Sequence, residues 1–414
     1  MKSLFLSLLL LLLTLHAISQ EISSFRGSGR MGIFNETGLL KTWPTNGPEL
    51  LLKADCCGKG YSSPVFYDNK VFITGVKHDT IDVCTAFDMN GNLLWEKPYG
   101  RAWFRSYPDT RSTPTIENGI IYLASGSGEI VAMDSDKGKI LWSVNAHEMY
   151  QGVYLQWGIA ESVLLTKDAV VYTTGGDFTS VVALKKTDGS LLWKTKSFGG
   201  ERSYASSVLI NINGRNLILS QIAKSLLCID PENGNVVWDY DLIQHHLQRS
   251  GKGNNSNTPI YSDGKIFVTS GYNHPGIMFS LADDGNSVEV VWKNDTLDTH
   301  HGGTVLVDGN IYGSNWLSNT NGNWVSLNWE SGKVNWETEW INKGSIITAD
   351  GMLYLFEEKS GTVALVEPSY EELKIKGAFK FDGGSGPFWA HPYIADGKLF
   401  LRHGDVLHVY NIKG

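Results

Sequence analysis

The chain has 414 residues, of which 45 are Gly and 14 are Trp, and charged residues make up 19%. Only 12 Pro and no long polar tract are present, which excludes collagen-like and disordered architectures. The net charge of -8 provides no basic surface for a phosphate backbone, so we expect no nucleic acid partner.

Residues 1–19 have the organisation of a secretory signal peptide. Lys2 precedes an apolar run from Leu4 to Leu15, and the small residues Ala17 and Ser19 are typical of a cleavage site. The run is too short to cross a bilayer core of roughly 30 Å. No Cys directly follows it, which argues against a lipid anchor. We expect an exported protein, periplasmic or extracellular, with residues 20–414 as one monomeric domain and no membrane span after cleavage. A single uncleaved anchor is the alternative.

A pattern of Gly followed four residues later by Trp recurs with a period of roughly 40–50 residues. The Trp residues of this series, the last-but-one of which follows a longer turn, are Trp95, Trp142, Trp193, Trp238, Trp292 and Trp336. Each repeat alternates β-branched segments with Gly, Asn and Asp turns, which is typical of antiparallel hairpins. Four short strands per repeat predict the blades of a β-propeller. We expect the large Trp rings to fill the seams between blades.

The predicted second strand of each repeat gives the number of blades. These strands lie, in chain order, near Val71, Ile120, Val170, Leu217, Ile266, Ile311, Leu353 and Leu399. The last repeat stops at Ile412 before any Trp strand, whereas the N-terminal segment of about 36–54 holds a strand at Glu49–Lys53 that has no repeat of its own. We therefore predict an all-β, eight-bladed propeller of four-stranded blades. Its N-terminal strand completes the last blade and closes the ring, which removes the unpaired edges.

Polar and aromatic side chains gather in the segments that lead into the first strand of each blade. In a propeller these strands line a central channel and the segments before them form one rim. Aromatic rings with Arg, Asn and His suit a polyhydroxylated or anionic ligand, through stacking and charge-assisted hydrogen bonds. The candidate ligand-binding residues are Arg105, Arg111, Trp157, Glu161, Arg202, Tyr204, Asn255, Asn257, His300, His301, Trp389 and His391. The alternative for any one of them is that it only fills the channel with water and mutual hydrogen bonds.

The adjacent residues His300 and His301 suggest a metal site at first sight. Neighbouring residues on a strand point to opposite faces, so we expect at most one of them to face the axis. The four Cys residues match no zinc pattern.

The motif Ala-x-Asp-x-x-x-Gly-x-x-x-Trp, complete in Ala132 to Trp142, resembles the blade repeat of pyrroloquinoline quinone (PQQ) propellers. Imperfect copies run from about residue 70 to the C-terminus. Segments near both ends resemble a secreted and mostly uncharacterised branch of this family, in which some members carry alcohol- or polyvinylalcohol-dehydrogenase labels. These segments include Phe25-Arg26-Gly27, Gly58 to Pro64, His300 to Gly303, Trp389 to Pro392 and Leu401-Arg402.

The resemblance gives two functional hypotheses. Quinoprotein alcohol dehydrogenases hold PQQ and Ca²⁺ on the propeller axis, whereas the barrel-assembly lipoprotein of the bacterial outer membrane is a scaffold of this architecture without a cofactor. For the enzyme, Cys56 and Cys57 resemble a vicinal disulfide that stacks against the quinone, and an oxidising compartment would allow it to persist. Cys84 and Cys228 are expected to be small buried thiols.

The acids that an enzyme would need are not arranged in a recognisable motif. Ca²⁺ takes about six to eight oxygen ligands, and a carboxylate base would have to accept the alcohol proton. The candidates are Asp109, Glu161, Glu201 and Asp298, which do not match the ligand motifs of the dehydrogenases. We therefore favour a module that binds a small molecule or an envelope protein at its axial rim. The alternative is a PQQ- and Ca²⁺-dependent dehydrogenase that oxidises an alcohol or a sugar.

Overall fold

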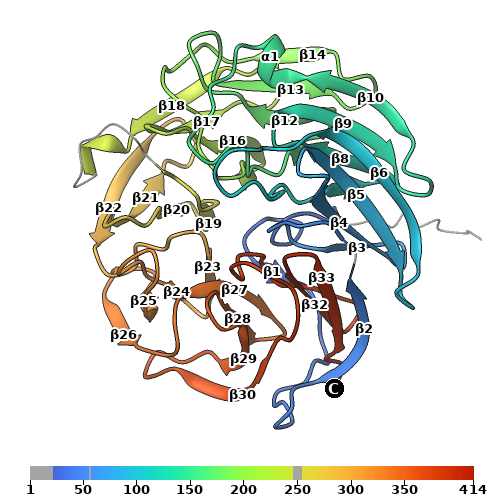
Figure 1. Cartoon of the computed structure of the whole chain (residues 1–414). Helices are drawn as coiled ribbons and strands as arrows, with labels where there is room; N and C mark the ends of the chain where they lie inside the picture. The colour runs from blue at the N-terminus through green and yellow to red at the C-terminus, as the bar shows by residue number, and fades with distance from the viewer. Residues whose placement is uncertain (1–21, 56, 246–253) are drawn as a thin grey trace, which may run out of the picture.

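The computed structural model describes residues 22–55, 57–245 and 254–414. Its strands form eight sheets that follow one another around a ring (Figure 1). Each sheet contains an antiparallel blade of four strands, with one strand edge near the axis and the other outside. The prediction of an all-β, eight-bladed propeller with four-stranded blades is confirmed. The expected signal peptide at residues 1–19 and Cys56 lie outside the described residues.

The first four blades use consecutive strands. They are β3 (Val65–Tyr67), β4 (Lys70–Lys77), β5 (Ile81–Asp88) and β6 (Leu93–Arg101); β7 (Thr115–Glu117), β8 (Ile120–Ala124), β9 (Glu129–Asp134) and β10 (Ile140–Asn145); β11 (Leu164–Leu165), β12 (Ala169–Thr173), β13 (Val181–Lys185) and β14 (Leu191–Lys194); and β15 (Val208–Ile212), β16 (Arg215–Gln221), β17 (Ser225–Ile229) and β18 (Val236–Asp241). Two short helices lie between blades, α1 (Ala146–Met149) after the second and η1 (Ile243–His245) after the fourth.

The remaining blades complete the ring. They are β19 (Ile260–Ser262), β20 (Lys265–Val268), β21 (Gly276–Leu281) and β22 (Val288–Asn294); β23 (Thr304–Val307), β24 (Asn310–Ser314), β25 (Trp324–Asn328) and β26 (Val334–Thr338); β27 (Gly344–Ala349), β28 (Met352–Glu357), β29 (Thr362–Glu367) and β30 (Lys374–Lys380); and β31 (Tyr393–Ala395), β32 (Lys398–His403) and β33 (Val406–Asn411) with β2 (Glu49–Asp55). A further strand, β1 (Ile33–Phe34), pairs in parallel with β27 and lies near the centre of the ring (Figure 1).

Tight turns explain how each blade begins. Asn118 and Gly119 join the first two strands of the second blade, with φ of 50° and 77°. Positive φ at both central residues defines the type I′ hairpin that Asn-Gly favours. We call the end of the ring that carries these turns the hairpin face. The segments that lead into the first strands emerge at the opposite end, the loop face.

The N-terminal strand closes the ring as the sequence predicts. β2 pairs antiparallel with β33, with Leu52 opposite Val409. The Leu52 side chain packs against Gly91 of the first blade. The fully buried Arg402 on β32 donates a hydrogen bond of 2.6 Å to the carbonyl of Thr74 on β4. The last blade therefore contains strands from both ends of the chain and is hydrogen-bonded to the first blade.

The six periodic Trp side chains lie at the seams between neighbouring blades. Each indole Nε1 donates to a backbone carbonyl of the next blade, at 2.8–3.2 Å. The Gly of a following repeat leaves space for the ring, because a Cβ at Gly234 would lie 2.5 Å from Cε3 of Trp193. Where the seventh blade lacks this Trp, Phe379 packs on Gly47. The Gly and Trp of the repeat thus belong to one contact between blades.

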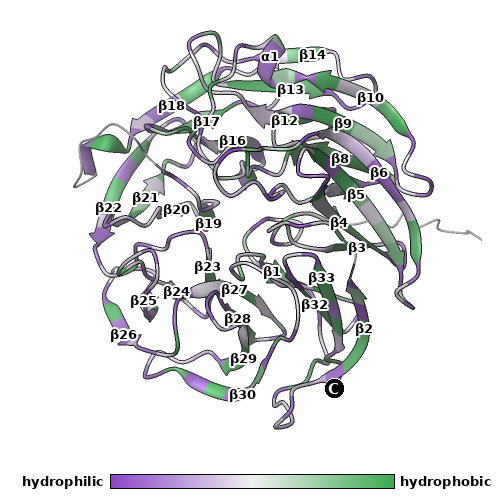
Figure 2. Ribbon diagram, viewed as in Figure 1, coloured by the Kyte–Doolittle hydropathy of each residue, from purple (hydrophilic) through white to green (hydrophobic). Residues whose placement is uncertain are grey.

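The strands inside each blade are buried on both faces, whereas the outermost strands alternate. The pattern on β28 is buried throughout, and on β22 it alternates between exposed and half-buried residues. Figure 2 shows hydrophobic and hydrophilic residues mixed along β22, β26 and β30. Within the described ranges, the structure contains no helix with the length and apolar character needed to cross a membrane.

Candidate functional site

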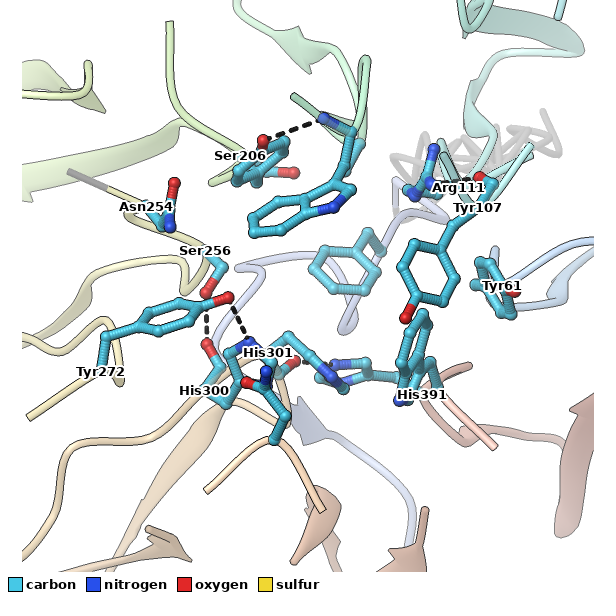
Figure 3. A pocket seen from close by; sticks show the side chains of 16 residues that line it. Tyr61, Tyr107, Arg111, Ser206, Asn254, Ser256, Tyr272, His300, His301 and His391 are labelled. Carbon is cyan, nitrogen blue, oxygen red and sulfur yellow. Dashed lines mark hydrogen bonds between the residues drawn. The ribbon is translucent and has the colours of Figure 1, made fainter. Parts of the chain in front are cut away.

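A cavity of about 260 Å³ opens at the loop face. The segments that lead into the first strands contribute residues from every blade except the seventh, so the cavity lies on the axis of the ring. We call it the axial pocket. Its aromatic residues are Phe25, Tyr61, Tyr107, Trp157, Tyr204, Tyr272 and Trp389, and its polar residues are Arg111, Ser206, Asn254, Ser256, His300, His301, Asn319 and His391. Figure 3 shows Tyr61, Tyr107 and Arg111 on one side of it and Tyr272 and His300 on the other.

Arg111 is the one cation among the described residues that line the axial pocket. Its guanidinium donates to the carbonyl of Tyr107 and lies 5.9 Å from the ring centre of Tyr61. Burial lowers the pKa of Arg111 from its usual value, although a guanidinium stays protonated at neutral pH. Asp109 and Asp82 act electrostatically on the guanidinium and favour its charged form, but neither forms an ion pair with Arg111 within contact distance. A desolvated cation without a paired carboxylate favours the approach of an anion.

Three histidines form the wall opposite Arg111. His300 Nε2 is 2.8 Å from the hydroxyl of Tyr272, and His391 Nε2 is 2.8 Å from the carbonyl of His301. Burial lowers the pKa of all three rings, to about 3 for His301, so they are neutral at physiological pH. This wall therefore offers hydrogen bonds without adding a positive charge.

Both adjacent histidines face the pocket, and the expectation that only one would do so is wrong. His300 and His301 line the cavity, with ring centres 4.4 Å apart. The reason is that they precede β23 in an irregular segment, where the alternation of a strand does not apply. Behind them, Lys343 and Glu358 form a buried ion pair at 2.7 Å, and the charge of Lys343 helps to lower the pKa of His301.

The structure brings seven of the predicted residues into the axial pocket. They are Arg111, Trp157, Tyr204, His300, His301, Trp389 and His391. Arg105 lies outside it, on a second cavity of the loop face, where its guanidinium is 5.4 Å from the ring centre of Trp103. Asn255 and Asn257 are buried, and their amides bond to the backbone carbonyls of Ile222 and Thr299. These two asparagines hold the loop that leads into the fifth blade.

Glu161 and Arg202 form a fully buried ion pair behind the pocket wall. The Arg202 Nη2 and Glu161 Oε2 atoms are 2.7 Å apart, and both side chains have 0% exposure. Thr173 donates to the same carboxylate from its amide and its hydroxyl. Desolvation raises the pKa of Glu161 to about 7, against the opposing effects of Arg202 and Thr173. Since neither side chain reaches the cavity, the pair supports the wall and does not contact a ligand.

Sequence reasoning missed the residues that reach the pocket from other parts of the fold. Tyr272 and Asn319 lie in loops between the second and third strands of their blades, which share the loop face. Phe25 comes from the N-terminal segment before any repeat. Tyr61 lies within the segment from Gly58 to Pro64. Because this segment leads into the first strand of the first blade, its position in the sequence could have predicted that Tyr61 lies at the rim.

The residues present do not fit a calcium-bound quinone. No carboxylate is among the described residues that line the axial pocket, while Ca²⁺ in proteins takes about six to eight oxygen ligands that usually include carboxylates. Of the candidate acids, Glu161 is paired with Arg202, and Asp298 accepts the amides of Asn273 and Trp316. Asp109 interacts with Tyr61 of the pocket but does not line the cavity, and Glu201 does not line it either. The described ranges hold no cluster of three or more His, Cys, Asp or Glu side chains with metal-binding geometry.

The cysteines do not add chemistry to the pocket. Cys84 and Cys228 are buried free thiols, and burial raises the pKa of Cys228 to about 12. Cys57 is buried as well. Because Cys56 lies outside the described residues, the vicinal disulfide stays a prediction.

The closed eight-bladed ring, the blade repeat and the axial pocket define a PQQ-like β-propeller. Residues 81–338 match the model of the family described as outer membrane protein assembly factor BamB, and the chain belongs to that family.

Individual proteins agree with this assignment. BamB of Yersinia pestis is 23% identical over 285 residues, which are 66% of this chain and 67% of that protein. The crystal structure of BamB from Moraxella catarrhalis has a TM-score of 0.63 at 14% identity and covers 88% of this chain and 99% of that one. Quinohemoprotein alcohol dehydrogenase from Comamonas testosteroni has a TM-score of 0.71 at 12% identity, with 93% and 79% covered. At these identities the two structures show the fold alone.

Proposed function

We propose that this chain is an exported binding module whose axial pocket holds an anionic group carried on an aromatic or otherwise flat body. The observation that carries the proposal is the lining of the pocket, which combines seven aromatic rings and Arg111 with neutral histidines and no described carboxylate. Aromatic rings bury flat apolar surface, and a guanidinium adds strong charge-assisted hydrogen bonds to an anion. Family membership supports a binding role over a catalytic one.

Calorimetric titration of the purified mature protein tests the proposal. The probes are 2-naphthoate as an aromatic anion, 2-naphthalenemethanol as its uncharged counterpart, and a neutral oligosaccharide. We expect 2-naphthoate to bind more tightly than the other two. Arg111→Ala should weaken binding of 2-naphthoate about tenfold or more, since a hydrogen bond to a charged group contributes roughly 1.5–3 kcal/mol.

Arg105→Ala is the matched control, because Arg105 lies in the same loop but lines the second cavity. It should leave the affinity for 2-naphthoate unchanged. Equal losses for Arg105→Ala and Arg111→Ala, or equal binding of 2-naphthoate and its alcohol, would contradict the assignment of Arg111.

The same titration decides between the binding module and the dehydrogenase. PQQ is a flat carboxylated molecule, so the binding module predicts that PQQ binds equally well with Ca²⁺ and with a chelator. Tight binding of PQQ only in the presence of Ca²⁺ would favour the dehydrogenase, and oxidation of alcohols or sugars with a redox dye would then be measured.

An envelope protein is the second candidate for the bound partner. Large apolar side chains are exposed at the loop face around the pocket, namely Phe104 at 58%, Leu317 at 57% and Ile341 at 51%. Exposed apolar residues at one face favour contact with a protein. If the loop face acts in outer membrane protein assembly, Leu317→Glu with Ile341→Glu should lower the amount of folded outer membrane proteins in cells, while the variant protein itself stays folded.

A further inference from the structure

The N-terminal segment of residues 22–34 lies inside the ring. Ser23 exchanges two backbone hydrogen bonds with Ile116 on β7, at 2.8 and 3.1 Å, and its hydroxyl donates to the carbonyl of Phe66 on β3. The segment ends in β1, which pairs with β27. It therefore crosses from the first two blades to the seventh through the centre of the channel.

Arg26 bonds the segment to three blades on one side of the channel. Its guanidinium donates to the carbonyl of Thr304 at 2.5 Å and of Ile346 at 3.0 Å, and it lies 3.1 Å from Nδ1 of His391. Gly303 leaves the space that this contact needs, because a Cβ there would lie 2.1 Å from Nη1 of Arg26. The side chain is only 3% exposed.

Arg30 bonds the segment to three further blades on the opposite side of the channel. It donates to the carbonyls of Ser162 and Val163, to the hydroxyl of Thr115 at 3.2 Å and to the carbonyl of Ser207 at 3.4 Å. With Ser23 and β1, the segment is thus hydrogen-bonded to seven of the eight blades. Arg26 and Arg30 both have φ near 60°, a left-handed conformation that costs free energy in a non-Gly residue and persists only where surrounding contacts hold it.

One residue of the segment lines the axial pocket, and the next residue, Arg26, contacts a pocket histidine without reaching the cavity. Phe25 lines the cavity and meets the ring of His391 edge-on, with centres 5.0 Å apart. Arg26 has no acceptor atom, so Nδ1 of His391 must accept its hydrogen bond. The ring proton is then on Nε2, which donates to the carbonyl of His301 at 2.8 Å. Arg26 is therefore a positioning residue that fixes one tautomer of a pocket histidine.

The segment leaves the channel at the hairpin face. The carboxylate of Glu36 accepts the amides of Asp396 and Gly397, in the turn between β31 and β32. The amide of Leu39 donates to the carboxylate of Asp350, in the turn between β27 and β28. The pocket residues lie at the other end of the same strands.

We infer that residues 22–34 are a built-in floor of the axial pocket, and that ligands enter and leave only at the loop face. Phe25 determines how deep an aromatic group can sit, and Arg26 orients His391 beside it. The roles of Phe25 and Arg26 rest on the proposed function, whereas the floor itself can be measured without a ligand.

Hydrogen exchange of the unliganded mature protein tests the floor directly. We expect the amides of residues 22–34 to exchange as slowly as those of β7 and β27. Arg26→Gln should speed exchange in this segment more than in the outer strands. Exchange of residues 22–34 at the rate of an unfolded peptide in the parent protein would overturn the inference, whatever the pocket binds.

Binding of 2-naphthoate tests the role of Phe25. Phe25→Ala should weaken it by about two- to tenfold, the range expected for one lost aromatic contact. Phe178→Ala is the matched control, since Phe178 is 42% exposed and lies outside the pocket. Unchanged affinity of Phe25→Ala would overturn its role in the site. If the parent protein binds no 2-naphthoate, the proposed function fails, and the exchange experiment still decides whether the floor exists.

Thiol labelling tests access from one face. A thiol in the variant Ser256→Cys lies in the pocket, and one in Ile33→Cys replaces a side chain that is 42% exposed on β1. Saturating 2-naphthoate should protect the first thiol from a maleimide and leave the labelling rate of the second unchanged. Protection of both thiols would show that the ligand reaches past the segment, and would overturn access from one face.

Discussion

Gly234→Ala tests whether the repeat requires Gly at this position because the Trp ring of the preceding blade packs against it. Gly234 has a φ of 76°, and a Cβ there would lie 2.5 Å from Cε3 of Trp193. Two costs add in the variant. A left-handed backbone costs an Ala residue roughly 1–2 kcal/mol, and forcing a methyl group into a packed seam costs roughly 1–3 kcal/mol. We expect the free energy of unfolding to fall by about 2–5 kcal/mol.

Two further variants separate these costs. Gly214 has a φ of 86°, and a Cβ added there would meet no atom within 4 Å, so Gly214→Ala should show the backbone cost alone. Trp193→Ala removes a side chain that is 6% exposed and its hydrogen bond to Pro231, and should cost roughly 3–5 kcal/mol. In the double variant the added methyl group has space. In the Trp193→Ala background, Gly234→Ala should therefore lower the free energy of unfolding no more than Gly214→Ala does in the parent protein.

The assay is urea unfolding followed by far-ultraviolet circular dichroism, which does not depend on the indole that is removed. Coupling between the two sites is the difference between the double variant and the sum of the single ones. The seam interpretation is refuted if Gly234→Ala is no more destabilising than Gly214→Ala. It is also refuted if the effects of Gly234→Ala and Trp193→Ala simply add.

Three further predictions concern buried ionisable groups. Burial and the charge of Arg26 hold the pKa of His391 well below that of an unfolded histidine, near 6.5, so the unfolded chain takes up the proton first. The stability that neutral His391 contributes is therefore present above pH 6.5 and lost as pH falls below it, by at most about 1.4 kcal/mol per pH unit, and a His391→Gln variant should show a shallower loss in urea titrations. Glu161→Gln leaves the Arg202 cation buried without its partner and should cost roughly 3–5 kcal/mol, measured by the same unfolding assay; a cost below 1 kcal/mol would contradict the buried pair. Cys84 and Cys228 should resist a thiol reagent in the native protein and react in urea, as read by peptide mass spectrometry, and rapid native labelling of either would contradict their burial.

The architecture could be predicted because it repeats. Hairpin turns recur from blade to blade, and a Gly packs against the Trp of the preceding blade at Gly138, Gly189, Gly234 and Gly332, so one such pair carries information about the other three. The site is predicted less completely, because a sequence shows the type of a charged residue and not its burial. Glu161 and Arg202 have the chemistry of ligand-binding residues, but they satisfy each other behind the wall. Phe25 could not be found from the repeat, because it belongs to a segment that folds back into the channel.

The pairing of β2 with β33 also determines when folding of the ring can be completed. Asn411 and Glu49 meet there although 362 residues separate them in the chain. Contacts between such distant residues require closure of a long loop, which costs entropy and slows folding. The seven other blades can each form from neighbouring strands as the chain emerges. The eighth must wait, so β2, among the first strands made, has no pairing partner until the final residues are available. Folding of this ring is therefore expected to end at its closing blade, and loss of the last strand would leave an open edge on each side of the gap.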